Sequence, residues 1–349
     1  MKILYGVPGE GMGHATRSKV IVAHLLKNHD VHMVSSSRAY QFLNKSFPGR
    51  VTEIEGFHLA YKNARVEKFR TAMNILKGAS GQLYRNFHRY QDMDKKFTPD
   101  LVISDFESFS FLFALQHRLP IISIDNMQII SRCKLEFTTP KAEKTNHQIA
   151  RNIIKAKVPG CKSYFITTFF YPPIIKDPTR LVPPILRDTI IAAPRSDGQH
   201  ITVYQTSESQ ENLVKILQQL PRERFLVYGF NRDANYGNVQ LKSFSEDSFI
   251  RDLAGGKAVL SNGGFSLISE AVYLRKPVCS VPIQAQFEQY VNAAYIEKLG
   301  YGRHLDKFAP DSLKAFIYEL ETYRQNLESY TQDGNREIFR ALDQELGRG

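Results

Sequence analysis

The sequence predicts an α/β protein made of two doubly wound parallel-sheet domains that face a cleft. Short apolar runs alternate with segments of helical period in both halves of the chain, which is the pattern of βα units. Polar turns follow several of these runs, and a dense group of prolines between residues 167 and 194 interrupts the alternation. We therefore expect domains at 1–190 and 191–330, and a helix within 331–349 that packs back on a domain face.

The composition is that of a globular protein. Its 349 residues are 42% hydrophobic and 23% charged, which is enough chain for about two domains with cores of their own. No run approaches the roughly 18 apolar residues of a spanning helix, and residues 1–14 lack a signal-peptide hydrophobic segment. We expect a cytoplasmic protein. Its three scattered cysteines, Cys133, Cys161 and Cys279, predict buried thiols and neither a disulfide framework nor a metal site.

The first apolar run, residues 2–7, leads into a glycine-rich turn that contains Gly11 and Gly13 and ends at His14. A helix is expected over 15–27. Such a turn lies at the carboxyl edge of a parallel sheet, where ligands bind in doubly wound folds. The glycine spacing is not the dinucleotide fingerprint, so no NAD site is predicted. His14 is a candidate catalytic base, with a structural role as the alternative, and both glycines are candidate contacts on the acceptor side.

Polar residues also follow the later apolar runs of the first half. Asp105 follows the run at 101–104, with Glu107 two residues further on, and Asp125 and Asn126 follow the run that starts at 121. Asp105 can therefore orient an imidazole at the same sheet edge and stabilise its protonated form. Capping of the next helix by Asp105 is the equal alternative. We expect Glu107, Asp125 and Asn126 to contact the acceptor.

The pattern weakens after residue 139 and returns at 162–166. The prolines of 167–194 predict an extended connection between domains, because proline continues neither a helix nor a central strand. The βα rhythm then restarts. Strands are expected at 51–54, 200–204, 225–228, 239–241, 257–260 and 278–281, and helices at 211–219, 247–253, 265–274 and 309–328.

The second half contains a glycine turn at 261–264, between an apolar run and a helix that carries Glu270. Such a turn lets backbone N–H groups approach an anion, and the helix dipole favours negative charge there. A loop rich in side-chain amides, residues 284–292, follows the next apolar run. Carboxylate and amides beside a phosphate site suit a sugar and its ribose. An ordinary strand–helix unit with an incidental glycine turn is the alternative.

Positive charge is concentrated in the first half. Residues 1–189 contain 28 Lys and Arg against 15 Asp and Glu, whereas the remainder has 18 against 20. The density is highest in residues 61–96, where aromatic residues interleave and a helix is expected. The charge fits either a solvated helix face or attraction to an anionic membrane surface or acceptor. No nucleic-acid motif accompanies it, so no nucleic-acid partner is predicted.

Two segments, GEGMGHATRS and SNGGFSLISEAVYLRKPVCSVPIQAQFEQYVNA, resemble the GT-B glycosyltransferases of family 28 and family 1 type. This group contains the lipid-intermediate N-acetylglucosaminyltransferase of peptidoglycan synthesis and the UDP-glycosyltransferases. The resemblance covers nearly the whole chain. It implies two Rossmann-like domains and transfer of a sugar from a nucleotide-diphosphate sugar, taken as UDP-linked, to an acceptor hydroxyl.

The resemblance also implies site roles. His14 matches the family's base and Asp105 its orienting carboxylate, while Glu270 would bind the ribose hydroxyls. The remaining donor-side residues comprise the diphosphate group Ser261, Asn262, Gly263 and Gly264, the sugar group Gln286, Glu288 and Gln289, and the pair Thr206 and Ser207 near the phosphates or acceptor. Phe265-Ser266 and the loop Gln-Ala-Gln-Phe-Glu-Gln depart from the family pattern, which leaves the identity of the sugar open.

The expected reaction inverts the anomeric carbon and needs neither a metal nor a cofactor, since no Asp-X-Asp occupies a donor-site position. The expected acceptor is a lipid-linked or anionic glycan of the cell envelope, reached from the inner face of the membrane. A non-hydrolysing UDP-sugar 2-epimerase and a non-catalytic sugar-binding protein are the alternatives. The basic, aromatic region 61–96 favours a transferase over the former, and His14 with Glu270 favours an enzyme over the latter.

Overall fold

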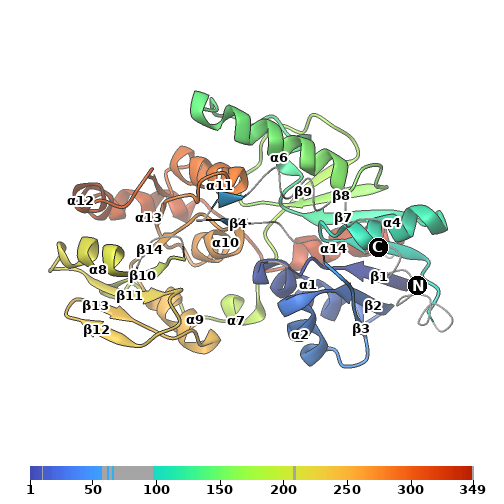
Figure 1. Cartoon of the computed structure of the whole chain (residues 1–349), viewed down its shortest axis with the longest axis horizontal. Helices are drawn as coiled ribbons and strands as arrows, with labels where there is room; N and C mark the ends of the chain where they lie inside the picture. Colours follow the sequence, from blue (N-terminus) through green and yellow to red (C-terminus); the bar gives the residue numbers. More distant parts are fainter. Residues whose placement is uncertain (10, 57–60, 63–64, 67–96, 207–209, 348–349) are drawn as a thin grey trace. The chain divides into compact units, whose positions relative to one another are not determined.

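A computed structural model describes the chain except residues 10, 57–60, 63–64, 67–96, 207–209 and 348–349 (Figure 1). The chain divides into two compact units. The first comprises Met1–Arg187 together with Asn335–Gly349, and the second is Asp188–Gly334. The last helix of the chain thus belongs to the unit that contains its first strand.

The first unit is built on a seven-stranded sheet in the order β3-β2-β1-β6-β7-β8-β9, with every pairing parallel. A separate antiparallel pair consists of β4 (Tyr61–Lys62) and β5 (Arg65–Val66). The strands of the large sheet are β1 (Lys2–Gly6), β2 (Asp30–Ser35), β3 (Val51–Glu53), β6 (Leu101–Ser104), β7 (Ile121–Asp125), β8 (Ser163–Thr167) and β9 (Thr179–Val182).

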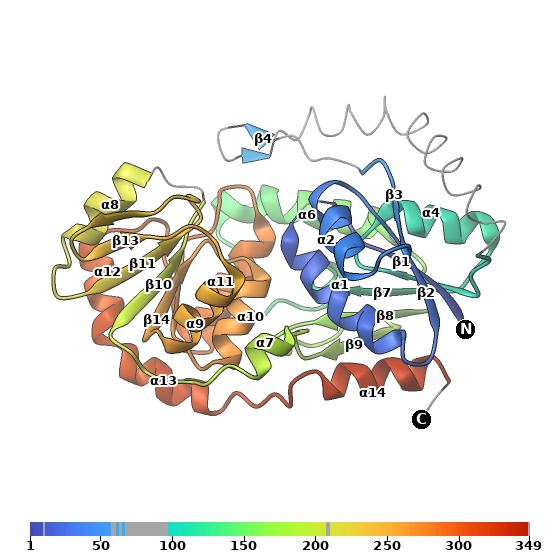
Figure 2. The ribbon, with the colours of Figure 1, turned by 90° about the horizontal axis from the view of Figure 1, so that it is seen from below.

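Helices cover both faces of this sheet, which explains why its strands are continuous apolar runs. In β1, Ile3 and Tyr5 pack with α1, α2 and α14 on one face, whereas Leu4 packs with α4 on the other. Figure 2 shows α14, in red, beside the strands of this unit. The helices are α1 (Met12–Leu25), α2 (Ser37–Ser46), α4 (Ser108–His117), α5 (Ile129–Arg132), the 3₁₀ turn Lys141–Glu143, α6 (Lys144–Lys157) and α14 (Arg336–Glu345).

The second unit is built on another seven-stranded sheet, in the order β12-β13-β11-β10-β14-β15-β16. Its pairings are parallel apart from β12 with β13. The strands are β10 (His200–Tyr204), β11 (Arg224–Tyr228), β12 (Ala234–Tyr236), β13 (Val239–Leu241), β14 (Ala258–Ser261), β15 (Val278–Ser280) and β16 (Gly302–His304).

One core of the second unit joins its strands to α8, α12 and α13 through side chains such as Leu213, Phe316 and Tyr323. The remaining helices include α10 and α11, which contact β14 and β15. In order, the helices are α7 (Asp188–Ile191), α8 (Gln210–Gln218), α9 (Glu246–Gly255), α10 (Phe265–Tyr273), α11 (Phe287–Lys298), α12 (Pro310–Tyr318) and α13 (Leu320–Glu328). Among the described residues, no helix combines the length and the apolar character needed to cross a bilayer.

The predicted fold class, α/β with two parallel-dominated sheets, is confirmed. The cysteines are free and buried, as predicted. The basic region expected at 61–96 lies outside the described residues except for β4 and β5. The helix expected at 309–328 is two helices, because the chain leaves regular helical geometry at Glu319 between α12 and α13.

The interpretation of 167–194 as a connection was wrong in part, because this segment contains β9 and α7. The prolines do not contradict a strand here. Pro178 precedes β9 and Pro183 follows it, and β9 is an edge strand of the sheet. Helix α6 was not predicted from the sequence. Only Ile154 of that helix is buried, and its isoleucines are outnumbered by polar and basic residues.

Candidate functional site

The carboxyl ends of three neighbouring strands bring the candidate residues of the first unit together. β6 pairs with β1 and with β7, and Ser104 is in register with both Gly6 and Ser123. The chain beyond each strand therefore starts at one edge of the sheet. Asp105 follows β6 directly, and Asn126 follows β7.

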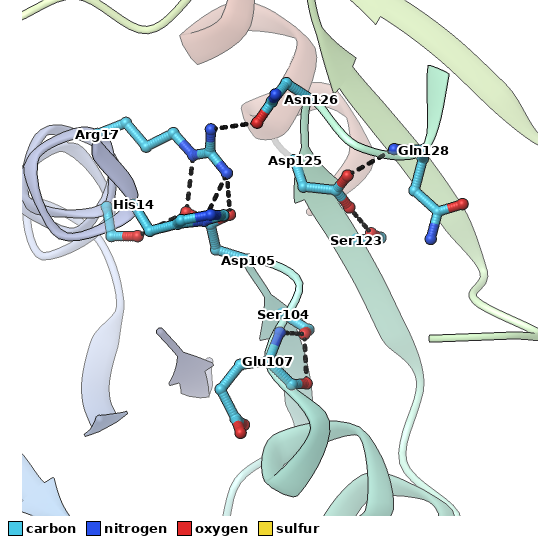
Figure 3. A network of polar contacts seen from close by, with 10 residues as sticks. His14, Arg17, Ser104, Asp105, Glu107, Ser123, Asp125, Asn126 and Gln128 are labelled. Carbon is cyan, nitrogen blue, oxygen red and sulfur yellow. Dashed lines mark hydrogen bonds and ion pairs between the residues drawn. The ribbon is translucent and has the colours of Figure 1, made fainter. Parts of the chain in front are cut away.

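Asp105 is the centre of a buried polar network (Figure 3). Its Oδ1 lies 2.9 Å from Nδ1 of His14, and it also accepts from Nη2 of Arg17. Its Oδ2 accepts from Nε of Arg17 at 2.8 Å and from Oγ of Ser18 at 3.0 Å. The predicted pairing of His14 with Asp105 is thus present, while Arg17 and Ser18 join it from the same helix.

Arg17 extends the network to the end of β7. Its Nη1 donates to Oδ1 of Asn126 at 2.6 Å, and Figure 3 shows the guanidinium between Asp105 and Asn126. Arg17 and Ser18 were not predicted from the sequence. Their spacing was the available signal, because residues three and four positions after His14 share its face of a helix.

Burial and charge set the protonation of this network. Burial alone would raise the pKa of the Asp105 carboxyl, but the charges of Arg17 and His14 hold that pKa below its usual range. Burial lowers the pKa of His14, and the Arg17 guanidinium lowers it further, against the opposing effect of Asp105. At neutral pH these shifts give an ionised carboxylate next to a neutral imidazole whose side chain remains 21% exposed.

The neutral imidazole has two tautomers, and its two neighbours favour different ones. Nδ1 of His14 lies 2.9 Å from Oδ1 of Asp105 and 2.7 Å from Nη2 of Arg17. An ionised carboxylate only accepts and a guanidinium only donates. A hydrogen on Nδ1 satisfies Asp105 and leaves a lone pair on Nε2, whereas a hydrogen on Nε2 satisfies Arg17.

The other acidic candidates make local hydrogen bonds. Glu107 is the N-cap of α4 and accepts from the backbone N–H groups of Phe109 and Ser110. The capping alternative considered for Asp105 is therefore wrong for that residue. Asp125 accepts from Oγ of Ser123 and from N of Gln128, and burial raises its pKa to about 6. The structure thus brings Asn126, but not the Glu107 carboxylate, into the network around Asp105.

The glycine turn before His14 has one backbone constraint. Gly11 is the N-cap of α1 with a φ of +83°, a conformation that other residues rarely adopt. Its carbonyl accepts from the N–H of His14 at 3.2 Å. Gly13 lies in the first turn of α1. Gly11 thereby fixes where the helix begins and where the imidazole stands.

The second unit forms its candidate site at the ends of β10, β14 and β15, which are also neighbours. Asn262 links these ends, because its Oδ1 accepts from N of Thr206 at 3.2 Å and its Nδ2 donates to O of Val281 at 3.2 Å. Oγ of Ser261 accepts from N of Gly263 at 3.2 Å. Ser207 lies outside the described residues.

The glycine turn after β14 approaches α11 closely. Gly263 has a φ of +91°, and a Cβ there would lie 2.9 Å from the carbonyl oxygen of Gln289. Gly264 is the N-cap of α10 with a φ of −63°, and a Cβ there would have no neighbour within 4 Å among the residues that the structure describes. The N-terminus of α10 is therefore preceded by open space on the Gly264 side, as an anion site at a helix N-terminus needs.

The amide loop is ordered by its own side chains. Nε2 of Gln289 donates to Oε1 of Gln286 at 2.6 Å, and Oε1 of Gln289 accepts from N of Ile283 at 3.0 Å. Nδ2 of Asn292 donates to Oε1 of Glu288 and to O of Gly263, each at 3.0 Å. The loop and the glycine turn are thus one hydrogen-bonded assembly. Glu270 lies within α10 and is 6% exposed.

Among the described residues, neither candidate site has the side chains that a metal centre needs. Among the residues that the structure describes, no three His, Cys, Asp or Glu side chains are placed to hold a metal ion.

Comparison with known proteins places the chain in one family. The sequence model of glycosyl transferase family 1 matches residues 1–321. Uncharacterised glycosyltransferases of Methanosarcina acetivorans and Methanosarcina mazei are each 21% identical to the chain, over alignments that cover 100% of it and 99% of the relative.

The fold is shared with solved glycosyltransferases. The calicheamicin glycosyltransferase CalG4 superposes with a TM-score of 0.70 at 16% identity, covering 99% of this chain and 98% of the other. Phytolacca americana UGT2, solved with UDP-2fluoro-glucose and pterostilbene, gives 0.66 at 14% identity with the same coverage. SsfS6 of Streptomyces, solved with thymidine diphosphate, gives 0.64 at 15%, covering 99% of each chain. With two parallel-sheet units of the GT-B type and a family match over residues 1–321, the chain belongs to glycosyl transferase family 1 and is a glycosyltransferase.

Proposed function

We propose that this glycosyltransferase moves a hexose from a UDP-sugar to an acceptor hydroxyl, with His14 as the general base and Asp105 as the carboxylate that orients it. The observation that carries the proposal is the hydrogen-bonded pair of a buried Asp105 and a partly exposed His14. The pKa of Asp105 is held low and that of His14 is lowered. The pair is therefore a carboxylate and a neutral imidazole at neutral pH, which is the state that a base requires.

The proposed proton transfer uses Nε2 of His14. With its hydrogen on Nδ1 and donated to Asp105, the imidazole presents the lone pair of Nε2 to an acceptor hydroxyl. That hydroxyl has a pKa far above 7, so removing its proton during attack is worth about 10²–10⁴-fold in rate. The carboxylate then stabilises the imidazolium that forms. Arg17 and Ser18 hold the carboxylate, Asn126 holds Arg17, and none of the three reacts.

The proposed donor site is the assembly around the N-terminus of α10. The backbone N–H groups after Gly263 and Gly264 and the helix dipole would stabilise the growing charge of the leaving diphosphate without a metal. Ser261, Asn262 and Thr206 would contribute to the same region, and Ser207 is proposed with them on sequence alone. Glu270 would bind the ribose. In-line attack on an α-linked donor would give an inverted product.

The sugar specificity is proposed to lie in the loop of Gln286, Glu288 and Gln289. These side chains bond to one another and to the turn at Gly263, so a sugar that binds there would meet groups held in fixed orientations. Relatives of this fold were solved with UDP-2fluoro-glucose and with thymidine diphosphate. We therefore expect a nucleoside diphosphate with a pyrimidine base, with uridine as the proposed one.

The proposed acceptor is a lipid-linked or anionic glycan of the cell envelope. Support comes from charge, since residues 1–189 carry 28 Lys and Arg against 15 Asp and Glu. A half of the chain with this excess of positive charge would be attracted to the anionic inner face of a membrane. We propose a peripheral, cytoplasmic protein whose acceptor-binding half meets the membrane. The proposed neighbours of the acceptor also include Gly11, Gly13, Glu107 and Asp125. The two carboxylates would act indirectly, by fixing the backbone to which they are hydrogen-bonded.

A thermal-shift panel of UDP-, GDP- and dTDP-sugars tests the donor proposal. A ligand that binds only the folded state stabilises it by RT ln(1 + [L]/Kd), about 2.7 kcal/mol at a hundredfold excess over Kd. We expect UDP-sugars to raise the melting temperature. Glu270→Gln should reduce that increase, whereas His14→Ala should retain it and abolish transfer. No shift with any of the three donors would overturn the proposal, and undiminished transfer by His14→Ala would overturn the assignment of the base.

A further inference from the structure

The first unit contains a basic pocket whose charged residues belong to neither of the sites described above. Its volume is about 170 Å³, and it is bounded by α5, the end of α6 and the segment before β9. Three cations line it, Arg132, Lys155 and Lys176, together with Gln128 and the ring of Tyr164. None of the described residues that line it is a carboxylate. The charge of the wall is therefore positive and uncompensated within the pocket.

Arg132 presents its guanidinium in a fixed orientation. Its Nε donates to Oγ1 of Thr179 at 2.6 Å, and its Nη2 donates to O of Asp177 at 2.9 Å. The guanidinium carbon also lies 3.6 Å from the centre of the Tyr164 ring. A guanidinium held in this way is pre-organised, and with Nε and Nη2 engaged by the protein it offers Nη1 as the donor to a phosphate oxygen.

The two lysines bring further positive charge to the same wall. Burial lowers the pKa of Lys176, and the charges of Lys155, Arg151 and Arg132 lower it further. The whole of α6, from Lys144 to Lys157, contains no Asp or Glu. Cations held close together repel one another, and an anion between them would relieve the repulsion. The chemistry of the wall thus selects a ligand with concentrated negative charge.

We propose that this pocket binds a phosphate group. Arg132 would donate to one of its oxygens from Nη1, Lys155 and Lys176 would neutralise its charge, and the amide of Gln128 would add a neutral donor. The site goes beyond the proposed sugar transfer, because its three cations belong neither to the network around Asp105 nor to the assembly around α10, and only Gln128 also contacts a residue of the first site, through its N–H to Asp125. Its phosphate could come from a lipid headgroup or from a soluble ester.

Exposed apolar side chains next to the pocket make the lipid source worth testing directly. Ile174 and Ile175, which immediately precede Lys176, are 42% and 51% exposed, and Tyr171 is 56% exposed. The backbone of this segment is fixed to α5, since N of Ile175 donates to O of Arg132 at 2.9 Å. Apolar side chains beside a phosphate site would enter the headgroup region of a bilayer.

The test compares two double variants of equal charge change. Lys155→Gln with Lys176→Gln removes two cations of the pocket, while Lys27→Gln with Lys45→Gln removes two exposed cations elsewhere in the first unit. Arg132 is left unchanged because it also holds the segment before β9. Binding of inorganic phosphate and glycerol 3-phosphate is measured by calorimetry at low ionic strength. Binding to phosphatidylcholine vesicles, with and without phosphatidylglycerol, is measured by flotation. Melting temperatures confirm that both variants fold.

We expect saturable phosphate binding that the pocket variant weakens by about tenfold or more and the control variant leaves unchanged, since charge-assisted hydrogen bonds are lost only in the former. Glycerol 3-phosphate binding without vesicle binding would support the site with a soluble ester, and pocket-dependent binding to phosphatidylglycerol vesicles would support it with a lipid. Equal losses in both variants, or no binding of any probe by the unaltered protein, would overturn the proposal. Because no donor sugar is used, neither result depends on the proposed transferase reaction.

Discussion

At the residue scale, the state of His14 depends on Arg17. The guanidinium contacts both the imidazole and the carboxylate that orients it, so it lowers the pKa of His14 and holds Asp105 ionised. It also competes with Asp105 for Nδ1. Arg17 is therefore a positioning residue, and its removal should change the titration of the base without removing the base.

We expect Arg17→Met to raise the pKa of His14, because a positive charge next to the imidazole disfavours its protonated form. Removal of Nη2 also leaves Asp105 as the only partner of Nδ1 among the described residues, so the hydrogen should reside on Nδ1. The ¹⁵N shifts of the imidazole, followed as a function of pH, report both the pKa and the tautomer. Arg17→Lys keeps the charge and should keep the pKa low.

The exposed Arg50 supplies a matched control, since it pairs with Asp30 and is one of the charges near His32. Arg50→Met should change the pKa of His32 and leave the pKa of His14 unchanged. A His14 pKa that stays the same or falls in Arg17→Met would contradict the role given to Arg17. The same result would leave the pairing of His14 with Asp105 intact, since that pairing rests on its own contact.

The residues of this network differ in how far sequence could predict them. Asp105 follows an apolar run directly and His14 ends the glycine turn after another, so the rule for parallel sheets places both at one edge. Arg17 follows no such rule, because a charged residue inside a helix is ordinarily on its solvated face. Glu107 shows the reverse case. Its position suggested a ligand contact, but only the φ and ψ angles that start α4 decide that it is a cap.

At the element scale, the glycine turn before α10 depends on Gly263 more than on Gly264. Gly263→Ala would place a Cβ at a φ of +91° and 2.9 Å from a backbone oxygen of α11. We expect a loss of about 2 kcal/mol of stability, and a weaker UDP-sugar shift because the turn carries the proposed anion site. Both are measured by thermal denaturation with and without the donor.

Gly264→Ala is the matched control for this turn. Its φ is −63° and the space around its Cβ is open, so the unliganded protein should keep its melting temperature. A methyl group there would stand in the space in front of the helix N-terminus and should still weaken the donor shift. Equal destabilisation by the two substitutions would contradict the geometry assigned to the turn.

Strands buried on both faces were predicted, and two elements that bury very little were not. β1, β10 and β14 are buried on both faces and read as apolar runs. β9 has one buried residue, Val182, and α6 also has only one, Ile154. An edge strand or a helix that buries so little has few apolar residues to mark it in the sequence.

At the scale of the whole molecule, the chain closes the first unit with its own C-terminal segment. Asn335 donates from Nδ2 to O of Leu186 and accepts at Oδ1 from N of the same residue, each at 2.8 Å. The chain thus leaves the first unit after Arg187 and returns next to that point. Sequence could predict a terminal helix from its period. It could not assign that helix to a sheet that begins more than three hundred residues earlier, because such a pairing leaves no local pattern.

If α14 belongs to the first unit, a defect in it should weaken that unit alone. Leu342 is fully buried in the core that contains β1, α1 and α2, so Leu342→Ala should cost about 2–5 kcal/mol there. Leu217 of α8 is equally buried in the core of the second unit, and Leu217→Ala provides the reciprocal change.

Amide hydrogen exchange followed by mass spectrometry shows which of the two units each substitution weakens. We expect Leu342→Ala to speed exchange in β1 and β6 and to leave β10 and β14 protected, with the opposite pattern for Leu217→Ala. Equal loss of protection in all four strands would mean that the two units unfold as one, and that the closing helix stabilises the chain as a whole.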